Sequence, residues 1–213
     1  KSGRESEQGS DAETCLPIFV PDNWGIDDVI AAFGLFLSRV SGNRSFDIAF
    51  YDSSTVAAEL LAEDQPLGID IDPQKSFATH RDAVRAEREL IDQHGFFSLD
   101  LPLRYPAINN TPLKDTASIH IVDSLAEPSA GDSPLSLWIA SDASVAELRY
   151  QAADLDDVWP ELLSRLPLFI AGCETGHALP VQTISLLSKP EEQQILVERN
   201  RTARDYDHRE TID

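Results

Sequence analysis

The sequence contains no methionine, two cysteines and few basic residues. The cysteines, Cys15 and Cys173, are far apart and match no metal-binding spacing, so we expect two reduced thiols in a cytoplasmic protein. Only 17 Lys and Arg residues accompany 37 Asp and Glu residues, which gives a net charge of −20. This charge repels nucleic acid and anionic membranes, and no apolar run reaches the length of a membrane span. We therefore expect no nucleic-acid partner and no membrane partner.

The lack of methionine also means that the sequence does not start at a natural start codon. Residues 1–14 are charged and without periodicity, which predicts a flexible leader. At the other end the sequence stops abruptly at Asp213. We expect a piece of a longer polypeptide, in which residues 15–183 fold as a domain and residues 184–213 form a linker.

Catalytic signatures are missing as well. The sequence has no G-x-S-x-G, no Walker loop, no H-E-x-x-H and no C-x-x-C, and none of its five histidines neighbours another. His120 and Asp123 lie three apart in a predicted strand, so they face opposite sides and do not form a dyad. Asp70 and Asp72 share a strand face, but two carboxylates alone do not make a metal site. We therefore predict no catalytic, cofactor-binding or metal-binding residue.

Two segments have apolar residues at helical spacing over several turns. Residues 26–40 carry so many apolar side chains that we predict a helix buried on most sides, ended by Gly42. Residues 155–170 predict another helix with one apolar face, and Pro167 should kink or end it.

A further helix is predicted over residues 77–94, with Ser76 as its N-cap and Gly95 after its end. Its apolar face is narrow. The other side is expected to be a solvated surface of ion pairs, in which Arg81, Arg85 and Arg88 alternate with Asp82, Glu87 and Glu89.

Strand patterns fill much of the remaining sequence. Residues 56–62 fit a helix or a strand equally, and residues 96–110 predict an ordered loop. We expect an α/β fold, with a mixed or mainly antiparallel sheet covered on one side by three helices. The predicted strands are residues 16–20, 46–51, 65–73, 117–123, 135–140 and 145–152, the last two joined as a hairpin.

The segment that organises our interpretation is near the end, at residues 184–206. Residues 184–187 predict a short strand, and Ser188 is a suitable N-cap for the helix that follows. Ser188 and Glu191 have the spacing of a capping box, and Pro190 is tolerated in a first turn. Ile195 and Leu196 give this helix an apolar stripe that is too thin to fold alone.

The order of residues in this segment resembles the junction between condensation and adenylation domains in nonribosomal peptide synthetases. The resemblance extends over about twenty positions, although Arg199 replaces the Trp that usually precedes the Asn. The matching residues are Leu186, Leu187, Ser188, Glu192, Leu196, Asn200, Thr202 and Tyr206.

Other segments resemble the same family. The buried helix, its Ser41-Gly42 turn and the next strand resemble a helix and central strand of condensation domains. The segment from Gln65 to Pro73 is similar to the strand L-P-L-R-V-D-I-D-P of that family. It departs from that pattern at Gln65 and Gly68.

This resemblance implies an α/β fold equivalent to half of a condensation domain, a lobe like half of chloramphenicol acetyltransferase. The family's catalytic motif H-H-x-x-x-D-G belongs to the first lobe and is absent here. The resemblance therefore implies a truncated, non-catalytic C-terminal lobe in an initiating module, which would serve as a platform for the adenylation domain that follows in cis. The expected interdomain interface comprises Leu186, Leu187, Ser188, Leu196, Asn200, Thr202 and Tyr206.

Two alternatives remain open. The lobe could complete an active condensation domain whose histidine-bearing lobe lies elsewhere, or it could be a docking module for another protein. In either case the parent synthetase would make an antibiotic or siderophore peptide. No cofactor is expected on this chain, because the phosphopantetheine of such enzymes is carried by a separate carrier domain.

Overall fold

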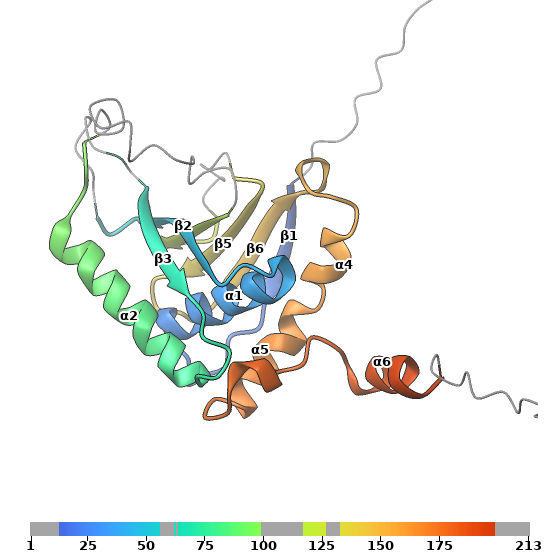
Figure 1. Cartoon of the computed structure of the whole chain (residues 1–213). Coiled ribbons are helices and arrows are strands. Elements are labelled where there is room, and N and C mark those ends of the chain that lie inside the picture. Colours follow the sequence, from blue (N-terminus) through green and yellow to red (C-terminus); the bar gives the residue numbers. More distant parts are fainter. Residues whose placement is uncertain (1–12, 56–61, 63, 99–116, 127–132, 199–213) are drawn as a thin grey trace, which may run out of the picture.

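A single mixed β-sheet is the centre of the domain in the computed structural model, which describes residues 13–55, 62, 64–98, 117–126 and 133–198 (Figure 1). The predictions for residues 1–12, most of residues 56–62, and residues 99–110 concern positions outside these ranges. The six strands are β1 (Glu13–Ile18), β2 (Ser45–Asp52), β3 (Gln65–Asp70), β4 (Ser118–Val122), β5 (Leu135–Ala140) and β6 (Ala146–Gln151).

The strands are arranged in the order β1-β6-β5-β4-β2-β3. β4 is parallel to both of its neighbours, whereas the β1–β6, β5–β6 and β2–β3 pairs are antiparallel. The predicted mixed sheet is therefore confirmed, and so is the hairpin of β5 and β6, whose turn includes Ala143 with a φ of 57°. The first strand was placed wrongly: it covers Glu13–Ile18 rather than residues 16–20, because its pairing with β6 begins at Glu13.

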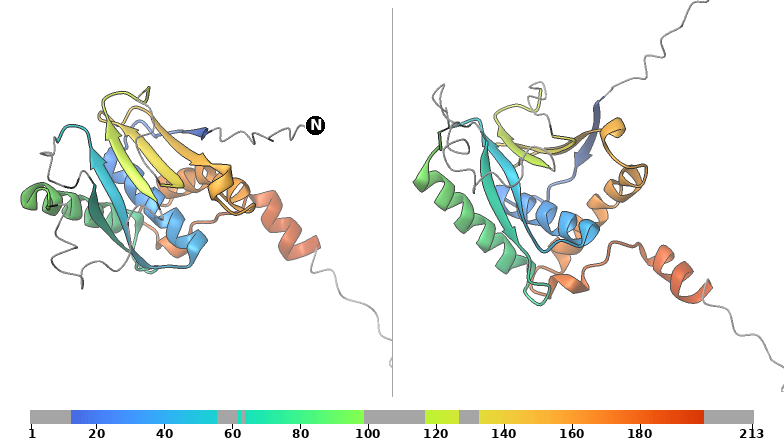
Figure 2. Two further views of the ribbon diagram at one scale, coloured as in Figure 1. Left: turned by 90° about the horizontal axis from the view of Figure 1, so that it is seen from above. Right: turned by 45° about the horizontal axis from the view of Figure 1, so that its top comes forward.

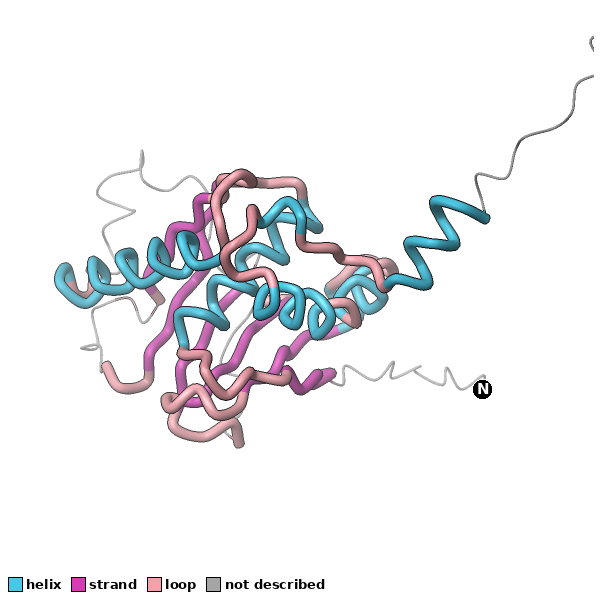
Figure 3. Tube along the Cα trace, turned by 90° about the horizontal axis from the view of Figure 1, so that it is seen from below, coloured by secondary structure: helices cyan, strands magenta, loops and turns pink. Residues whose placement is uncertain are grey.

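The register divides the sheet into two faces with different chemistry. Paired residues lie on the same face, so Phe50, Ile119 and Leu137 form one row across β2, β4 and β5. This row belongs to the hydrophobic core. The helices cover this face, as Figure 3 shows from below. The next residue of each strand, namely Tyr51, His120 and Trp138, faces the other way.

Helix α1 (Ile26–Ser41) is the most buried helix, with every residue from Val29 to Ser38 buried. The backbone N–H of Gly25 donates to Asp28 Oδ2 at 2.9 Å, which satisfies one free donor of the first turn. Gly42 ends the helix with a φ of 76°, a left-handed conformation in which a side chain would be strained. The prediction for this segment is confirmed.

Helix α2 (Phe77–His94) also follows its prediction, with Ser76 Oγ accepting from Thr79 N and Gly95 after its last residue. Its arginines, however, do more than face solvent. Arg85 and Arg88 both bind Asp27 in the first turn of α1. Sequence spacing indicated partners on the same helix. Such pairs exist, since Asp82 pairs with Arg81 and Arg85. The fold also places the acidic start of α1 beside this face, so further ion pairs join the two helices.

The prediction of one helix over residues 155–170 is wrong, because the segment is divided into shorter pieces. The structure has a 3-10 turn η3 (Ala152–Asp154), then α4 (Trp159–Leu163), a break at Ser164 and Arg165, and α5 (Leu166–Thr175). Pro167 lies in the first turn of α5, where it needs no N–H partner, so it starts a helix rather than ending one. Buried residues from both pieces contact the core, namely Leu163, Leu166, Phe169 and Ile170.

Candidate functional site

The C-terminal segment does not contain the strand predicted over residues 184–187. A 3-10 turn η4 (Val181–Thr183) is followed by bends up to Leu187, and Ser185 Oγ bonds within the segment to Leu187 N and O at 3.0 Å. A strand needs a neighbouring strand for its backbone groups, and β1 and β3 form the two edges of the sheet elsewhere. The segment is irregular because it crosses α5 instead of the sheet.

Close packing fixes this crossing to the domain. A Cβ placed on Gly172 of α5 would lie 2.8 Å from Cγ2 of Ile184, so only glycine allows this approach. Ile184 is 5% exposed, and Leu186 packs partly buried against the core. Leu187 is also half-buried, so two of the three leucines of the predicted interface, Leu186 and Leu187, belong in part to the domain's own packing.

Helix α6 (Lys189–Gln193) begins at a complete capping box, as predicted. Ser188 Oγ accepts from Glu191 N at 3.4 Å, and Glu191 Oε2 accepts from Ser188 N at 2.8 Å. The Ser188 hydroxyl donates to Glu191 Oε2 at 2.7 Å, and this bond, together with the one from Ser188 N, lowers the pKa of the Glu191 carboxyl. Arg165 Nη2 lies 3.3 Å from Glu191 Oε1 and links the start of α5 to α6.

A turn of π-helix, η5 (Gln194–Glu198), continues α6 and carries three adjacent apolar residues that are exposed. Ile195, Leu196 and Val197 are 40%, 59% and 53% exposed, and we call them the apolar tip. Figure 2 shows α6 leading away from the rest of the domain in both views. Asn200, Thr202 and Tyr206, the remaining residues of the predicted interface, lie outside the described residues.

A second cluster lies on the sheet face opposite the helices. The rings of Tyr51, His120 and Trp138 are stacked in sequence, with centroids 4.5 Å and 4.3 Å apart and interplanar angles of 4° and 6°. The Arg149 guanidinium lies 4.0 Å from the Trp138 ring centroid and is paired with Glu147. We call these residues the polar stack.

Two serine hydroxyls form hydrogen bonds with rings of the polar stack. Ser118 Oγ and His120 Nε2 are 2.9 Å apart, and Trp138 Nε1 donates to Ser136 Oγ at 2.9 Å. Burial and the nearby Arg149 charge lower the pKa of His120 from 6.5 to about 4. His120 is therefore neutral near pH 7, and it is 4% exposed. A general base must lie within hydrogen-bond reach of its substrate. The His120 imidazole is enclosed, so its role here is packing.

The polar stack was missed by sequence reasoning, although a signal existed. The strands S-I-H-I-V and L-S-L-W-I-A alternate polar or aromatic residues with aliphatic ones, which indicates two faces of different chemistry. Reading them only as buried strands concealed this alternation.

The other residues considered for catalysis or metal binding contribute to the fold instead. His80 is 4% exposed; its Nε2 accepts from Asp72 N and its Nδ1 is 2.9 Å from Ser76 O, which joins a turn to the start of α2. Cys15 and Cys173 are both free, and burial raises the pKa of Cys173 to about 12. Within the described ranges, no group of His, Cys, Asp or Glu is arranged to hold a metal ion, so Asp70 and Asp72 form no such group. No helix in the described part of the chain combines the length and apolarity that crossing a bilayer requires.

Comparisons with known proteins show which solved structures share this architecture. No protein-family model and no curated protein sequence matches the chain. Among solved structures, the first condensation domain of the CDA synthetase aligns at 16% identity and a TM-score of 0.57, covering 76% of this chain and 42% of that one. The starter condensation domain of the rhizomide synthetase RzmA aligns at 14% identity and a TM-score of 0.60, covering 83% and 48%.

The condensation domain of the monacolin K polyketide synthase MokA is similar too, at 13% identity and a TM-score of 0.58, with coverage of 84% and 52%. The chain thus spans about half the length of the structures it matches. Its fold is that of about half of a condensation domain, which confirms the fold that the sequence resemblance implied.

Proposed function

We propose that this chain is a non-catalytic, condensation-like unit of a nonribosomal peptide synthetase and a structural platform for an adenylation domain in the same polypeptide. The observation that carries the proposal is the apolar tip on its capped helix. Its three adjacent aliphatic residues present apolar surface to water. They suit a surface that another domain covers.

The position of the tip supports this role. Arg165, the Ser188–Glu191 capping box and the Gly172–Ile184 contact hold the start of α6 against the domain. A fixed base and an apolar end are suited to setting the distance and orientation of a neighbour. The sequence resemblance at residues 184–206 supports an adenylation domain as that neighbour.

The missing catalytic motif and the enclosure of His120 support the non-catalytic part of the proposal. The sequence lacks H-H-x-x-x-D-G, and the histidine nearest the centre of the sheet, His120, is enclosed by Tyr51 and Trp138. We expect the purified chain to form no peptide bond between aminoacyl thioester donors and amine acceptors above the uncatalysed rate. The measurement is product formation by mass spectrometry. Turnover that is lost on replacing His120 or His94 by Ala would contradict this prediction.

We expect Leu196→Asp, in a polypeptide that joins this chain to its adenylation domain, to loosen the interface. The change would place a charge in a contact that should be apolar, at a cost of about 2–5 kcal/mol if the site is desolvated. Amide hydrogen exchange at Ser188–Val197 should become faster, and adenylate formation, measured by pyrophosphate exchange, should fall.

Val158→Asp is the matched control, because Val158 is also aliphatic and 60% exposed but lies beside α4. It should leave both measurements unchanged. Normal adenylation and unchanged exchange in the Leu196→Asp protein would remove the basis for the platform.

The alternative function is the C-terminal lobe of an active condensation domain. The observation that favours it is that this chain aligns with about half of each of these condensation-domain structures. Adding a histidine-bearing first lobe and measuring peptide-bond formation distinguishes the two functions. Activity restored by that lobe would favour the alternative.

A further inference from the structure

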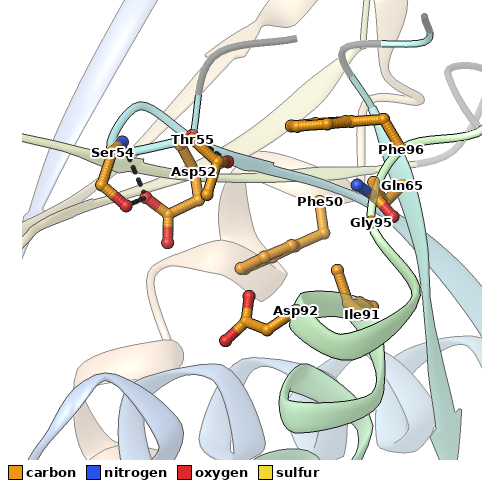
Figure 4. Close-up of a pocket in the computed structure, with 9 residues that line it drawn as sticks. All are labelled: Phe50, Asp52, Ser54, Thr55, Gln65, Ile91, Asp92, Gly95 and Phe96. Carbon is orange, nitrogen blue, oxygen red and sulfur yellow. Dashed lines mark hydrogen bonds between the residues drawn. The ribbon is translucent and has the colours of Figure 1, made fainter.

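A hollow of about 300 Å³ lies where the ends of β2 and β3 meet the C-terminal end of α2 (Figure 4). Phe50 and Asp52 come from β2, Gln65 begins β3, and Asp92 and Phe96 come from the end of α2 and the residues after it. This volume is at the lower end for small-molecule sites, which span about 300–1,000 Å³.

Gln65 is the unusual member of this lining. It shares the row of Leu67 and Ile69 that faces the helices, and it is 8% exposed. Among the described residues no hydrogen bond is made to its side-chain amide, and Figure 4 shows that amide between the rings of Phe50 and Phe96 in this view. Neither atom of this amide is sealed in the core, because among the described residues only Arg88 Nε is a fully buried side-chain nitrogen or oxygen without a hydrogen bond; the amide opens to the hollow. A polar residue in an apolar row, aimed into a hollow, indicates a ligand.

The charges of the hollow identify the chemistry of that ligand. Asp52 Oδ1 accepts from the N and Oγ of Ser54 at 2.9 Å and 2.7 Å, which leaves its second oxygen for another donor. Asp92 is exposed and forms no ion pair within the described part of the chain. Arg88, one turn earlier on α2, binds Asp27 instead. Among the described residues, the lining of the hollow has two carboxylates and no cationic side chain.

The aromatic rings add to this preference. Phe50 and Phe96 present apolar surface to an aliphatic chain, and the faces of such rings attract cations. The guanidinium of Arg88 already lies 5.7 Å from the Phe50 ring centroid, so this ring accepts a cation in the fold itself.

We propose that the hollow binds an alkylammonium group. Asp52 and Asp92 supply the countercharge, the carbonyl oxygen of Gln65 accepts a hydrogen bond from the ammonium, and the rings contact the aliphatic carbons. A free amine and a lysine side chain of another polypeptide share this chemistry.

The test is a titration of the whole chain with n-butylammonium, followed by amide NMR. Resonances of Phe50, Gln65 and Phe96 should shift, and the uncharged N-butylacetamide should bind much more weakly. Asp92→Asn should weaken binding about tenfold, the usual effect of losing a charged hydrogen-bond partner. Glu89→Gln is the matched control, since it removes the same charge from an exposed position of α2 outside the hollow.

Gln65→Leu separates ligand binding from a structural role. It should raise the denaturation midpoint, because Leu suits the apolar row, and it should weaken n-butylammonium binding. Binding that is unchanged in Gln65→Leu, or equally weakened by Glu89→Gln, would overturn the proposal, as would equal binding of N-butylacetamide. A second titration with Nα-acetyl-lysine methylamide assigns the source: tighter binding than n-butylammonium indicates a lysine side chain, and weaker binding a free amine.

Discussion

Replacing Phe169 by Ala should lower the free energy of unfolding by about 3–5 kcal/mol, the range for deleting a buried aromatic ring. Phe169 lies on α5 and is fully buried. Its ring meets that of Phe36 on α1 edge-on, with centroids 5.9 Å apart and an interplanar angle of 60°. Losing the ring removes its contacts and leaves a cavity between two helices, which close-packed neighbours cannot fill completely. Urea denaturation followed by circular dichroism measures the change.

Leu168→Ala is the control for this prediction, because Leu168 neighbours Phe169 on α5 but is 41% exposed. Its cost should stay below about 1 kcal/mol, as for most partly exposed positions. A double-mutant cycle with Phe36→Ala should give a coupling of about 0.5–1.5 kcal/mol for the ring pair. A loss below about 1 kcal/mol for Phe169→Ala would show that α5 is not held in the core as described.

The elements that could be predicted from sequence are those whose ends are encoded locally. Helices α1 and α2 have apolar periodicity, and each has a glycine directly after its last turn. Gly42 and Ser76 determine helix ends through their own backbone and side chain, so neighbours in sequence suffice to find them.

The break between α4 and α5 could not be predicted in the same way. Pro167 is compatible with ending one helix or starting another, and only the packing of Leu166 and Phe169 against the core selects the second possibility. The irregular course of residues 184–187 has a similar cause, because it depends on the approach of Ile184 to Gly172 on α5.

The candidate sites show the same limit. The apolar tip was partly visible as Ile195 and Leu196, and the capping box at Ser188 was predicted from spacing alone. The polar stack joins Tyr51, His120 and Trp138 from three strands, and its chemistry appears only when the fold brings them side by side. The hollow likewise joins residues from two strands and a helix. Sequence patterns mark such residues as polar in a strand without giving their partners.

The polar stack leads to the second large prediction, a loss of stability in mild acid. The unfolded chain takes up a proton on His120 near pH 6.5, whereas the folded chain does so only near pH 4, because burial and Arg149 oppose the charge. Between these values the unfolded state binds more protons, so stability falls as the pH falls from 6.5 to 4. The contribution is about 3 kcal/mol over this window, at about 1.4 kcal/mol for each pH unit.

His120→Phe tests the origin of this loss, because Phe keeps an aromatic ring between Tyr51 and Trp138 but cannot take up a proton. The many carboxylates also titrate in this range, but their effect is common to both proteins and cancels when the two unfolding free energies are subtracted. The difference should therefore shift by about 3 kcal/mol in favour of His120→Phe between pH 6.5 and 4, and stay constant above that window. In the unmutated chain, the ring proton resonances of His120 should titrate near pH 4. A difference that does not change with pH, together with a titration near 6.5, would mean that water reaches the imidazole and that the stack is open. A closed stack keeps His120 neutral in the folded chain at neutral pH, between the rings of Tyr51 and Trp138.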